Sequence, residues 1–140
     1  MGYCVSSMKS KVFIKNEVKK EAFEALKKFT KQKQNKNESL TWVYFDEILE
    51  AESLGEALEN CRWEVSVDDL GNIDELEFIG EKLGDELEIF NSIASYFNEG
   101  SYIEMSGEDG DIWRYLFKDG ECKEIHPKIT WEEWGVDDDN

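Results

Sequence analysis

Three short runs near the C-terminus constrain the fold of this chain most strongly. They cover residues 101–106, 112–118 and 121–126, and the middle run is rich in aromatic side chains. The pairs Asp109-Gly110 and Asp119-Gly120 separate them. Asp-Gly between apolar runs is a strong signal for a tight β-hairpin turn. The sequence therefore predicts a three-stranded antiparallel meander in this region.

The middle run also indicates which side of the meander is buried. Trp113, Tyr115 and Phe117 occupy alternate positions, so their side chains point to one face and that of Arg114 points to the other. Large aromatic side chains contribute most to stability when they are removed from water. We therefore expect the aromatic face to pack against a helix.

A second hairpin is expected upstream. Residues 63–67 alternate apolar and polar side chains, as a half-buried strand does. In residues 75–78, Leu76 and Phe78 alternate with acids in the same way. The intervening segment 69–72 contains a glycine, which suits a turn.

Helices are predicted where apolar residues recur at a spacing of three to four. The segments with this pattern are 17–31, a short stretch at 46–51, 53–61 and 85–98. Asn16 is expected to cap the first helix, and Ser53 with Glu56 forms a capping-box pair before the third. Further short strands are expected at 2–6, 11–15 and 41–45, with a polar loop at 32–39.

Strands grouped into hairpins, with helices between them, predict an α+β fold in which a mostly antiparallel sheet packs against two or three helices. A chain of 140 residues fits a single domain. Within it we distinguish a basic strand–helix part (1–36), an acidic α+β body (37–134) and an acidic tail (135–140).

Charge is distributed unevenly along the chain. The formal net charge is −17. Ten lysines and three glutamates give residues 1–36 a charge of +7, so the remaining residues carry −24. The two parts should attract each other, either within one chain or between the copies of a homo-oligomer. A net charge this large favours solubility but opposes compaction, so folding does not require it.

Residue types that carry most enzyme chemistry are sparse. His126 is the one histidine, and the sequence contains neither a Gly-x-Ser-x-Gly motif nor a glycine-rich phosphate loop. The histidine and the cysteines lack the close spacing of a zinc motif. A calcium loop beginning at Asp68 would need an oxygen ligand where Leu70 stands. We therefore expect a protein that is not an enzyme, with no catalytic residue, metal or cofactor.

Cysteine usage and hydropathy bear on location. Cys4, Cys61 and Cys122 are odd in number and far apart, which favours free thiols in a reducing compartment. No apolar run reaches the roughly 18 residues of a membrane-spanning helix. The first residues lack the pattern of a signal peptide. We expect a cytoplasmic protein, in a bacterium or a phage-infected host cell, with no membrane partner.

Acidic side chains are the best candidates for a binding surface. Glu75 and Glu77 should stand roughly 6.8 Å apart on one face of a strand, and duplex DNA also presents closely spaced negative charges. Further acids expected to project from strands and hairpin tips are Glu104, Glu108, Asp109 and Asp111. A basic groove that binds nucleic acid would be attracted to such a surface. The basic helix at 17–31 could contact phosphates, but the charge of the remaining chain would repel them, so direct nucleic-acid binding is not expected.

One segment resembles a known pattern. Residues 100–117, GSYIEMSGEDGDIWRYLF, resemble a GSYIEM-x-GEDG-x-x-WRY-x-F segment of small acidic proteins of Gram-positive bacteria and their phages. The strand at 63–65 and the FIGEKL segment at 78–83 are similar too, so the resemblance covers about the last 90 residues. It implies a phage, mobile-element or host setting, and no particular activity.

These observations favour a non-catalytic inhibitor whose partner is a basic protein, a nuclease or another nucleic-acid-binding enzyme. In a phage setting this would be an anti-defence protein that imitates DNA and blocks a restriction or CRISPR enzyme. One alternative is an immunity protein that neutralises a basic toxin nuclease. A second alternative is a small-ligand-binding protein or enzyme in which Trp113, Tyr115 and Arg114 line a pocket on the sheet.

Overall fold

Six strands and four α-helices make up the part of the chain that the computed structural model describes, residues 3–134. In chain order they are β1 (Val5–Lys11), α1 (Lys19–Asn35), α2 (Phe45–Leu49), α3 (Leu54–Asn60), β2 (Trp63–Val67), β3 (Ile73–Phe78), α4 (Glu86–Ile93), β4 (Tyr102–Gly107), β5 (Ile112–Lys118) and β6 (Glu121–Ile125). Short 3-10 turns precede α1 at Asn16–Val18 and follow α4 at Ala94–Tyr96. The expected acidic tail, with Asp137 to Asp139, lies outside the described residues.

The strands pair antiparallel throughout. One sheet has the order β1-β4-β5-β6, and β2 and β3 form a separate hairpin. Both Asp-Gly turns connect neighbouring strands as predicted: β4 pairs with β5, and β5 with β6. The predicted α+β class with a mostly antiparallel sheet is therefore confirmed, and the helices number four because residues 45–60 form two short ones.

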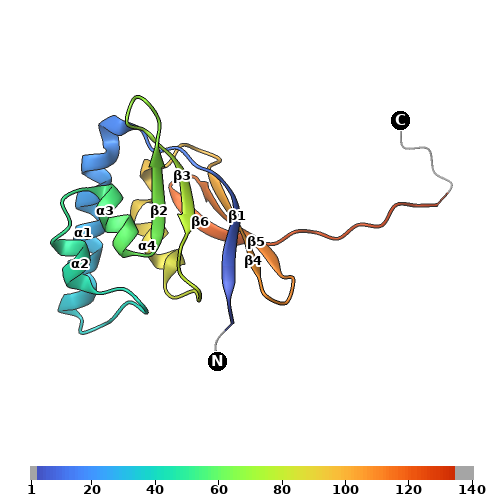
Figure 1. Cartoon of the computed structure of the whole chain (residues 1–140), viewed down its shortest axis with the longest axis horizontal. Coiled ribbons are helices and arrows are strands. Elements are labelled where there is room, and N and C mark those ends of the chain that lie inside the picture. Colours follow the sequence, from blue (N-terminus) through green and yellow to red (C-terminus); the bar gives the residue numbers. More distant parts are fainter. Residues whose placement is uncertain (1–2, 135–140) are drawn as a thin grey trace.

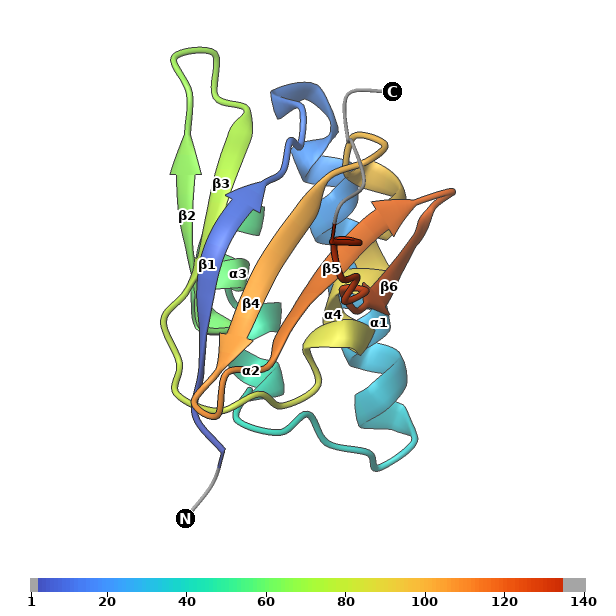
Figure 2. The ribbon, with the colours of Figure 1, turned by 90° about the vertical axis from the view of Figure 1, so that its right-hand side faces the viewer.

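Serine side chains join the hairpin to the larger sheet. The backbone N–H of Leu76 in β3 donates to Oγ of Ser10 in β1 at 3.2 Å, and that of Phe78 donates to Oγ of Ser7 at 2.9 Å. Beyond the end of β1, Ile14 exchanges two backbone hydrogen bonds with Ile73, each 2.9 Å long. The six strands therefore lie side by side in the order β2-β3-β1-β4-β5-β6 (Figure 2).

Helices cover one face of this strand layer. In Figure 1 the helices lie on the left of the strands. Figure 2 views the molecule from the right-hand side of Figure 1, so the strands stand in front of the helices. The helices cover the face that carries Trp113, Tyr115 and Phe117, all of which are buried. The expected burial of this aromatic face by helices is confirmed. After β6 the chain leaves the body as an extended segment, with Trp131 and Trp134 almost fully exposed.

The core between the two layers is an aromatic cluster. Phe90 of α4 lies at its centre, with ring centroids 5.0 Å from Trp63, 5.7 Å from Tyr115 and 5.5 Å from Phe117. In edge-on and tilted packing, the positive edge of one ring contacts the negative face of its neighbour, which is a favourable electrostatic arrangement. The cluster connects α4 to the hairpin on one side and to the larger sheet on the other.

The N-terminal prediction is partly wrong. Instead of two strands at 2–6 and 11–15, the structure has one strand, β1, whose polar sequence VSSMKSK lacks clear alternation. It is a strand because it pairs with β4 and because its serines accept hydrogen bonds from β3, contacts that are distant in sequence. Asn16 does not cap the following helix through its side chain; its backbone N–H donates to Oδ1 of Asn72 at 2.8 Å.

The boundaries around residue 40 also differ from the prediction. α1 continues to Asn35, into the segment expected to be a loop, since its polar residues can extend an exposed helical turn. Residues 41–45 are not a buried strand: Leu40 and Val43 face each other across a tight turn, and α2 begins at Phe45. The predicted short helices in the region 46–61 are confirmed, and Ser53 caps α3 by accepting from the Glu56 N–H at 3.2 Å.

Among residues 3–134, no helix combines the length and the apolar character needed to cross a bilayer.

Candidate functional site

Glu75 and Glu77 project into solvent from the face of β3 that the helices leave open. Glu77 stands directly opposite Glu64 of β2, and Glu75 stands opposite Ser66. All three glutamates are exposed, and none forms an ion pair with another described residue. Like charges directly opposite each other on a sheet reduce stability. The hairpin therefore carries an uncompensated acidic strip.

Glu104 differs from this strip because its charge is compensated. Its Oε1 accepts a hydrogen bond from Nε of Arg114 across the β4–β5 pair at 2.9 Å. The Arg114 guanidinium also lies over the ring of Tyr102, 4.1 Å from the centroid. Glu104 therefore contributes less to an attractive surface than its sequence position suggests.

Glu108, Asp109 and Asp111 lie together at the β4–β5 turn, where they hold the N-terminal segment. The backbone N–H of Cys4 donates to Oε1 of Glu108 at 2.7 Å, and the hydroxyl of Tyr3 donates to Oδ1 of Asp109. This hydrogen bond raises the pKa of Tyr3 to about 12 and lowers the pKa of Asp109. The turn acids thus have a structural role in addition to their charge.

A further group of exposed carboxylates lies on and between the two short helices, and it was not singled out from the sequence as a binding surface. We call it the α2–α3 acidic patch; its members are Asp46, Glu47, Glu50, Glu52, Glu56 and Glu59. All six are exposed, and none forms an ion pair within the described range 3–134. The sequence did hold a signal, since no lysine or arginine occurs between Lys36 and Arg62.

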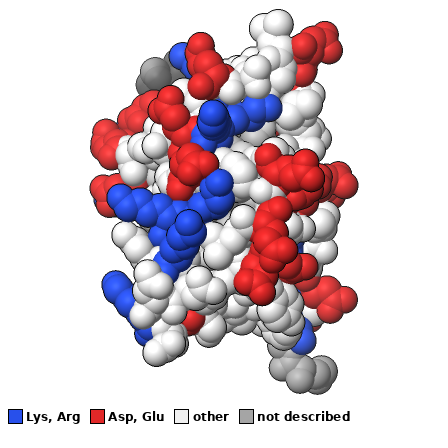
Figure 3. All heavy atoms as spheres, turned by 90° about the vertical axis from the view of Figure 1, so that its left-hand side faces the viewer, with Lys and Arg blue, Asp and Glu red and all other residues white. Residues whose placement is uncertain are grey.

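A groove separates this patch from the basic helix α1. Lys19 and Lys20 line one side and Glu52, Glu56 and Glu59 the other, while apolar side chains form the floor of a space of about 610 Å³. Figure 3, which views the helical side of the molecule, shows a band of basic groups with acidic groups directly against it on the left and a further acidic group on the right, beyond uncharged surface. The acids across the groove are therefore separated from the lysines that line its other side.

A second cavity, which we call the Trp42 pocket, opens where strand ends and two loops meet. It has a volume of about 650 Å³ and is lined by Tyr3, Val5, Trp42, Lys82, Leu83, Asp111, Trp113, Glu124 and His126. Nε2 of His126 lies 2.9 Å from Oε2 of Glu124. Trp113 is 7% exposed, and its buried Nε1 has no hydrogen-bond partner among the described residues.

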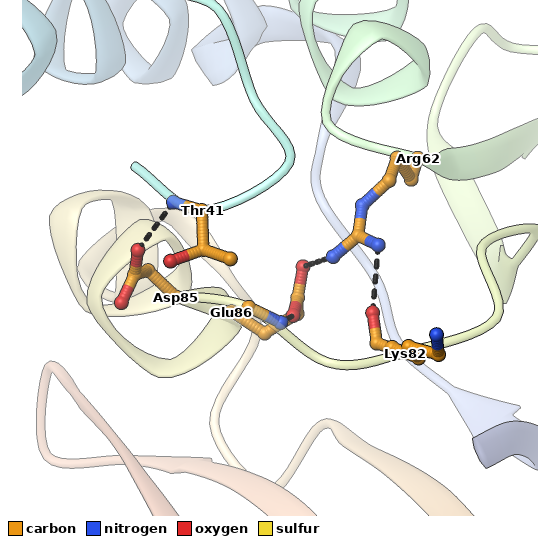
Figure 4. A network of polar contacts seen from close by, with 6 residues as sticks. Thr41, Arg62, Lys82, Asp85 and Glu86 are labelled. Atoms are coloured by element: carbon orange, nitrogen blue, oxygen red, sulfur yellow. Dashed lines mark hydrogen bonds and ion pairs between the residues drawn. The ribbon is translucent and has the colours of Figure 1, made fainter. Parts of the chain in front are cut away.

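A network of polar contacts holds the two loops of this pocket in place (Figure 4). Asp85 Oδ2 accepts from the Thr41 N–H at 2.7 Å, which fixes the turn that carries Trp42. Arg62 donates to the carbonyl of Lys82 at 2.6 Å and to the carboxylate of Glu86 at 3.0 Å. The loop that carries Lys82 and Leu83 is thereby held by Arg62, which also binds Glu86.

Glu86 is the buried centre of that network. It is 1% exposed, and its other carboxylate oxygen accepts from the Gly84 N–H at 2.5 Å. Burial raises the pKa of Glu86, while the Gly84 N–H and Arg62 oppose the rise. A Cβ at Gly84 would lie 2.5 Å from the Thr41 carbonyl oxygen, so the close approach of the two loops requires glycine there.

The pocket expected from Trp113, Tyr115 and Arg114 does not form from all three residues. Tyr115 is 2% exposed and packs on Phe90 in the core. Trp113 and Arg114 line a smaller cavity of about 320 Å³ beside Pro127. Residues 3–134 contain no group of three or more His, Cys, Asp or Glu side chains placed to hold a metal ion.

Comparison with protein-family models, curated proteins and solved structures finds no significant match.

Proposed function

We propose that this protein binds the basic, nucleic-acid-binding surface of another protein and competes there with the nucleic acid. The observation that carries the proposal is the α2–α3 acidic patch, six exposed carboxylates without a described ion-pair partner. The strip formed by Glu64, Glu75 and Glu77 adds a second uncompensated group. Unpaired like charges repel one another and reduce stability, so their concentration is better explained by binding than by folding.

The physics of association supports a polyanion-like role. A surface of concentrated negative charge steers a basic partner toward it and raises the association rate. That attraction is screened as salt rises, because the Debye length falls from roughly 10 Å at 0.1 M to about 3 Å at 1 M. A partner that binds DNA or RNA must expose a positive groove, which the acidic surface would occupy.

In the phage or mobile-element setting that the sequence resemblance implies, the partner would be a restriction or CRISPR enzyme and the protein an anti-defence inhibitor. An immunity protein against a basic toxin nuclease would use the same electrostatics. The two roles differ in the partner's identity and in which protein is encoded beside this one.

The experiment uses two variants of equal net charge. The patch variant replaces Glu47, Glu50, Glu52 and Glu59 with Gln. The control replaces four exposed acids outside the patch, Glu17, Glu21, Glu81 and Glu121, whose side chains form no hydrogen bond or ion pair within residues 3–134. Each protein is immobilised, a nuclease captured from host lysate is purified, and its binding is measured in competition with labelled DNA.

We expect the patch variant to bind at least about tenfold more weakly at 0.1 M salt, mainly through a slower association rate, and the control to keep most of the affinity. DNA should be displaced by the wild type and retained in the presence of the patch variant. An equal loss of affinity in the two variants would show that binding depends on net charge alone and not on the patch. Simultaneous binding of DNA and this protein would rule out competition.

A further inference from the structure

We propose that the Trp42 pocket binds the guanidinium group of an arginine side chain presented by the basic partner. This inference rests on the proposed function and deepens it, because it identifies one anchoring contact within a charge-driven interface. Arginine is a frequent anchor residue at protein interfaces, where it inserts into a pocket of the other protein.

The pocket is a built site and not a chance hollow. Its volume of about 650 Å³ lies within the roughly 300–1,000 Å³ of small-molecule sites. Both of its loops are tied to the buried Glu86 region, one through Asp85 and Thr41 and the other through Arg62 and Lys82. A side chain that enters would therefore meet walls that are already in position.

Trp42 is held in an unusual conformation at this pocket. Its φ is 67°, a left-handed value that is costly for a bulky residue. Its side chain is also 55% exposed, so burial of the indole does not offset that cost. Residues strained in this way concentrate at ligand clamps. The exposed ring offers a flat aromatic surface on which a planar cation can stack.

The charges of the pocket favour a cation. The carboxylates of Asp111 and Glu124 line it together with the ammonium of Lys82 and the imidazole of His126. Glu124 Oε2 lies 2.9 Å from His126 Nε2, and Asp111 Oδ2 accepts from the Tyr3 hydroxyl at 3.4 Å, so each carboxylate keeps one oxygen for a guanidinium. Guanidinium is planar, stacks on aromatic rings and presents paired donors to carboxylates, whereas the ammonium of lysine does not.

The test uses a short peptide, acetyl-Gly-Arg-Gly-amide, and its citrulline analogue, which has nearly the same shape without the charge. Binding is followed through the indole N–H signals of the ¹⁵N-labelled full chain. We expect the arginine peptide to shift the signals assigned to Trp42 and Trp113 and to bind at least about tenfold more tightly than the citrulline peptide. Equal binding of the two peptides would overturn the proposal.

Three variants separate the contacts. Trp42→Gly removes the ring and relieves the left-handed strain, so we expect an unchanged or higher melting temperature together with lost binding. Asp111→Asn with Glu124→Gln should weaken the arginine peptide several-fold and leave the citrulline peptide unaffected. Lys82→Ala removes a like charge and should strengthen arginine binding; a weaker complex would indicate an anionic ligand and would refute the assignment.

The patch variant with Gln at positions 47, 50, 52 and 59 keeps every residue of the pocket. Retained peptide binding by that variant, together with unchanged nuclease binding, would refute the proposed function and leave the arginine site standing. Weaker nuclease binding by that variant, with no preference of the wild type for arginine over citrulline, would support the function and refute the site.

Discussion

Phe97 and Phe117 stack face to face, with ring centroids 3.7 Å apart and planes inclined by 11°. Phe97 follows the 3-10 turn after α4, and Phe117 lies on β5, so this contact fixes the helical layer to the centre of the sheet. Phe90 packs edge-on against both rings, at 6.3 Å and 5.5 Å between centroids. The three rings are therefore in mutual contact within the core.

The first prediction concerns the ring of Phe117, which is 1% exposed. Phe117→Ala should lower the free energy of unfolding by roughly 3–5 kcal/mol, since it removes buried apolar surface and leaves a cavity. Such a loss is a large part of the stability of a typical domain. Urea denaturation followed by tryptophan fluorescence measures it. Leu87→Ala on the partly exposed side of α4 is the matched control and should cost far less; similar losses in the two variants would contradict the assigned core.

The Arg62–Glu86 pair yields the second prediction. Glu86→Leu leaves the partly buried guanidinium without its carboxylate and should cost about 3–5 kcal/mol of unfolding free energy. Arg62→Met leaves the buried carboxylate of Glu86 without its cation and should lower the free energy of unfolding as well. In the double variant neither charge is left unpaired, so its loss should be smaller than the sum of the single losses. A double-mutant cycle in urea measures this coupling, and strictly additive losses would show that the pair contributes none.

The hairpins could be predicted because their determinants are local. Asp119 and Gly120 both adopt positive φ between β5 and β6, as an Asp-Gly turn requires. β1 could not be predicted in the same way. Its Ser7 and Ser10 accept hydrogen bonds from β3, about seventy positions later in the chain, and a local pattern does not reveal such contacts. Trp42 was misassigned because a tryptophan beside β-branched residues resembles a strand, whereas the structure places it in a tight turn.

The candidate site was predicted less completely than the fold. Acidic residues are visible in any sequence, but their availability depends on neighbours in space. Glu104 is paired with Arg114, Glu108 accepts from the Cys4 N–H, and Asp109 accepts from Tyr3, so these predicted contact residues are engaged within the chain. The acids of α2 and α3 have no ion-pair partner among the described residues, since Lys19 and Lys20 of α1 lie across a groove. The Trp42 pocket combines loops from both halves of the chain, which no local pattern reveals.

The cysteines provide a third prediction. Cys61 and Cys122 are buried, and burial raises the pKa of each thiol to about 12, whereas Cys4 is exposed. Because the thiolate is the reactive form, only Cys4 should react with a thiol reagent at pH 8 in the folded protein. All three should react in denaturant. Mass spectrometry after brief labelling counts the modified sites, and rapid labelling of Cys61 would show that α3 does not pack as described.

The last prediction concerns the contact between Tyr3 and Asp109, which holds the N-terminal segment on the β4–β5 turn. The folded-state pKa of Asp109 is lowered, so this contact contributes above the unfolded value of roughly 3.9 and is lost as pH falls through the folded value. The pKa of Tyr3 is raised to about 12, so the same contact contributes below roughly pH 10 and is lost as pH rises through about 12. The N-terminal segment should therefore be held between about pH 4 and pH 10.

Ultraviolet titration of tyrosine ionisation tests this directly, with Tyr3→Phe used to identify the signal of Tyr3. In Asp109→Asn the carboxylate that accepts the phenol proton is gone, so Tyr3 should ionise at lower pH, closer to roughly 10. Glu121→Gln changes the net charge equally, lies at the start of β6, and should leave the titration unaltered. Order in residues 3–5, followed by ¹⁵N relaxation, should decrease in Asp109→Asn at neutral pH. An identical Tyr3 titration in wild type and Asp109→Asn would show that the hydrogen bond does not form in solution.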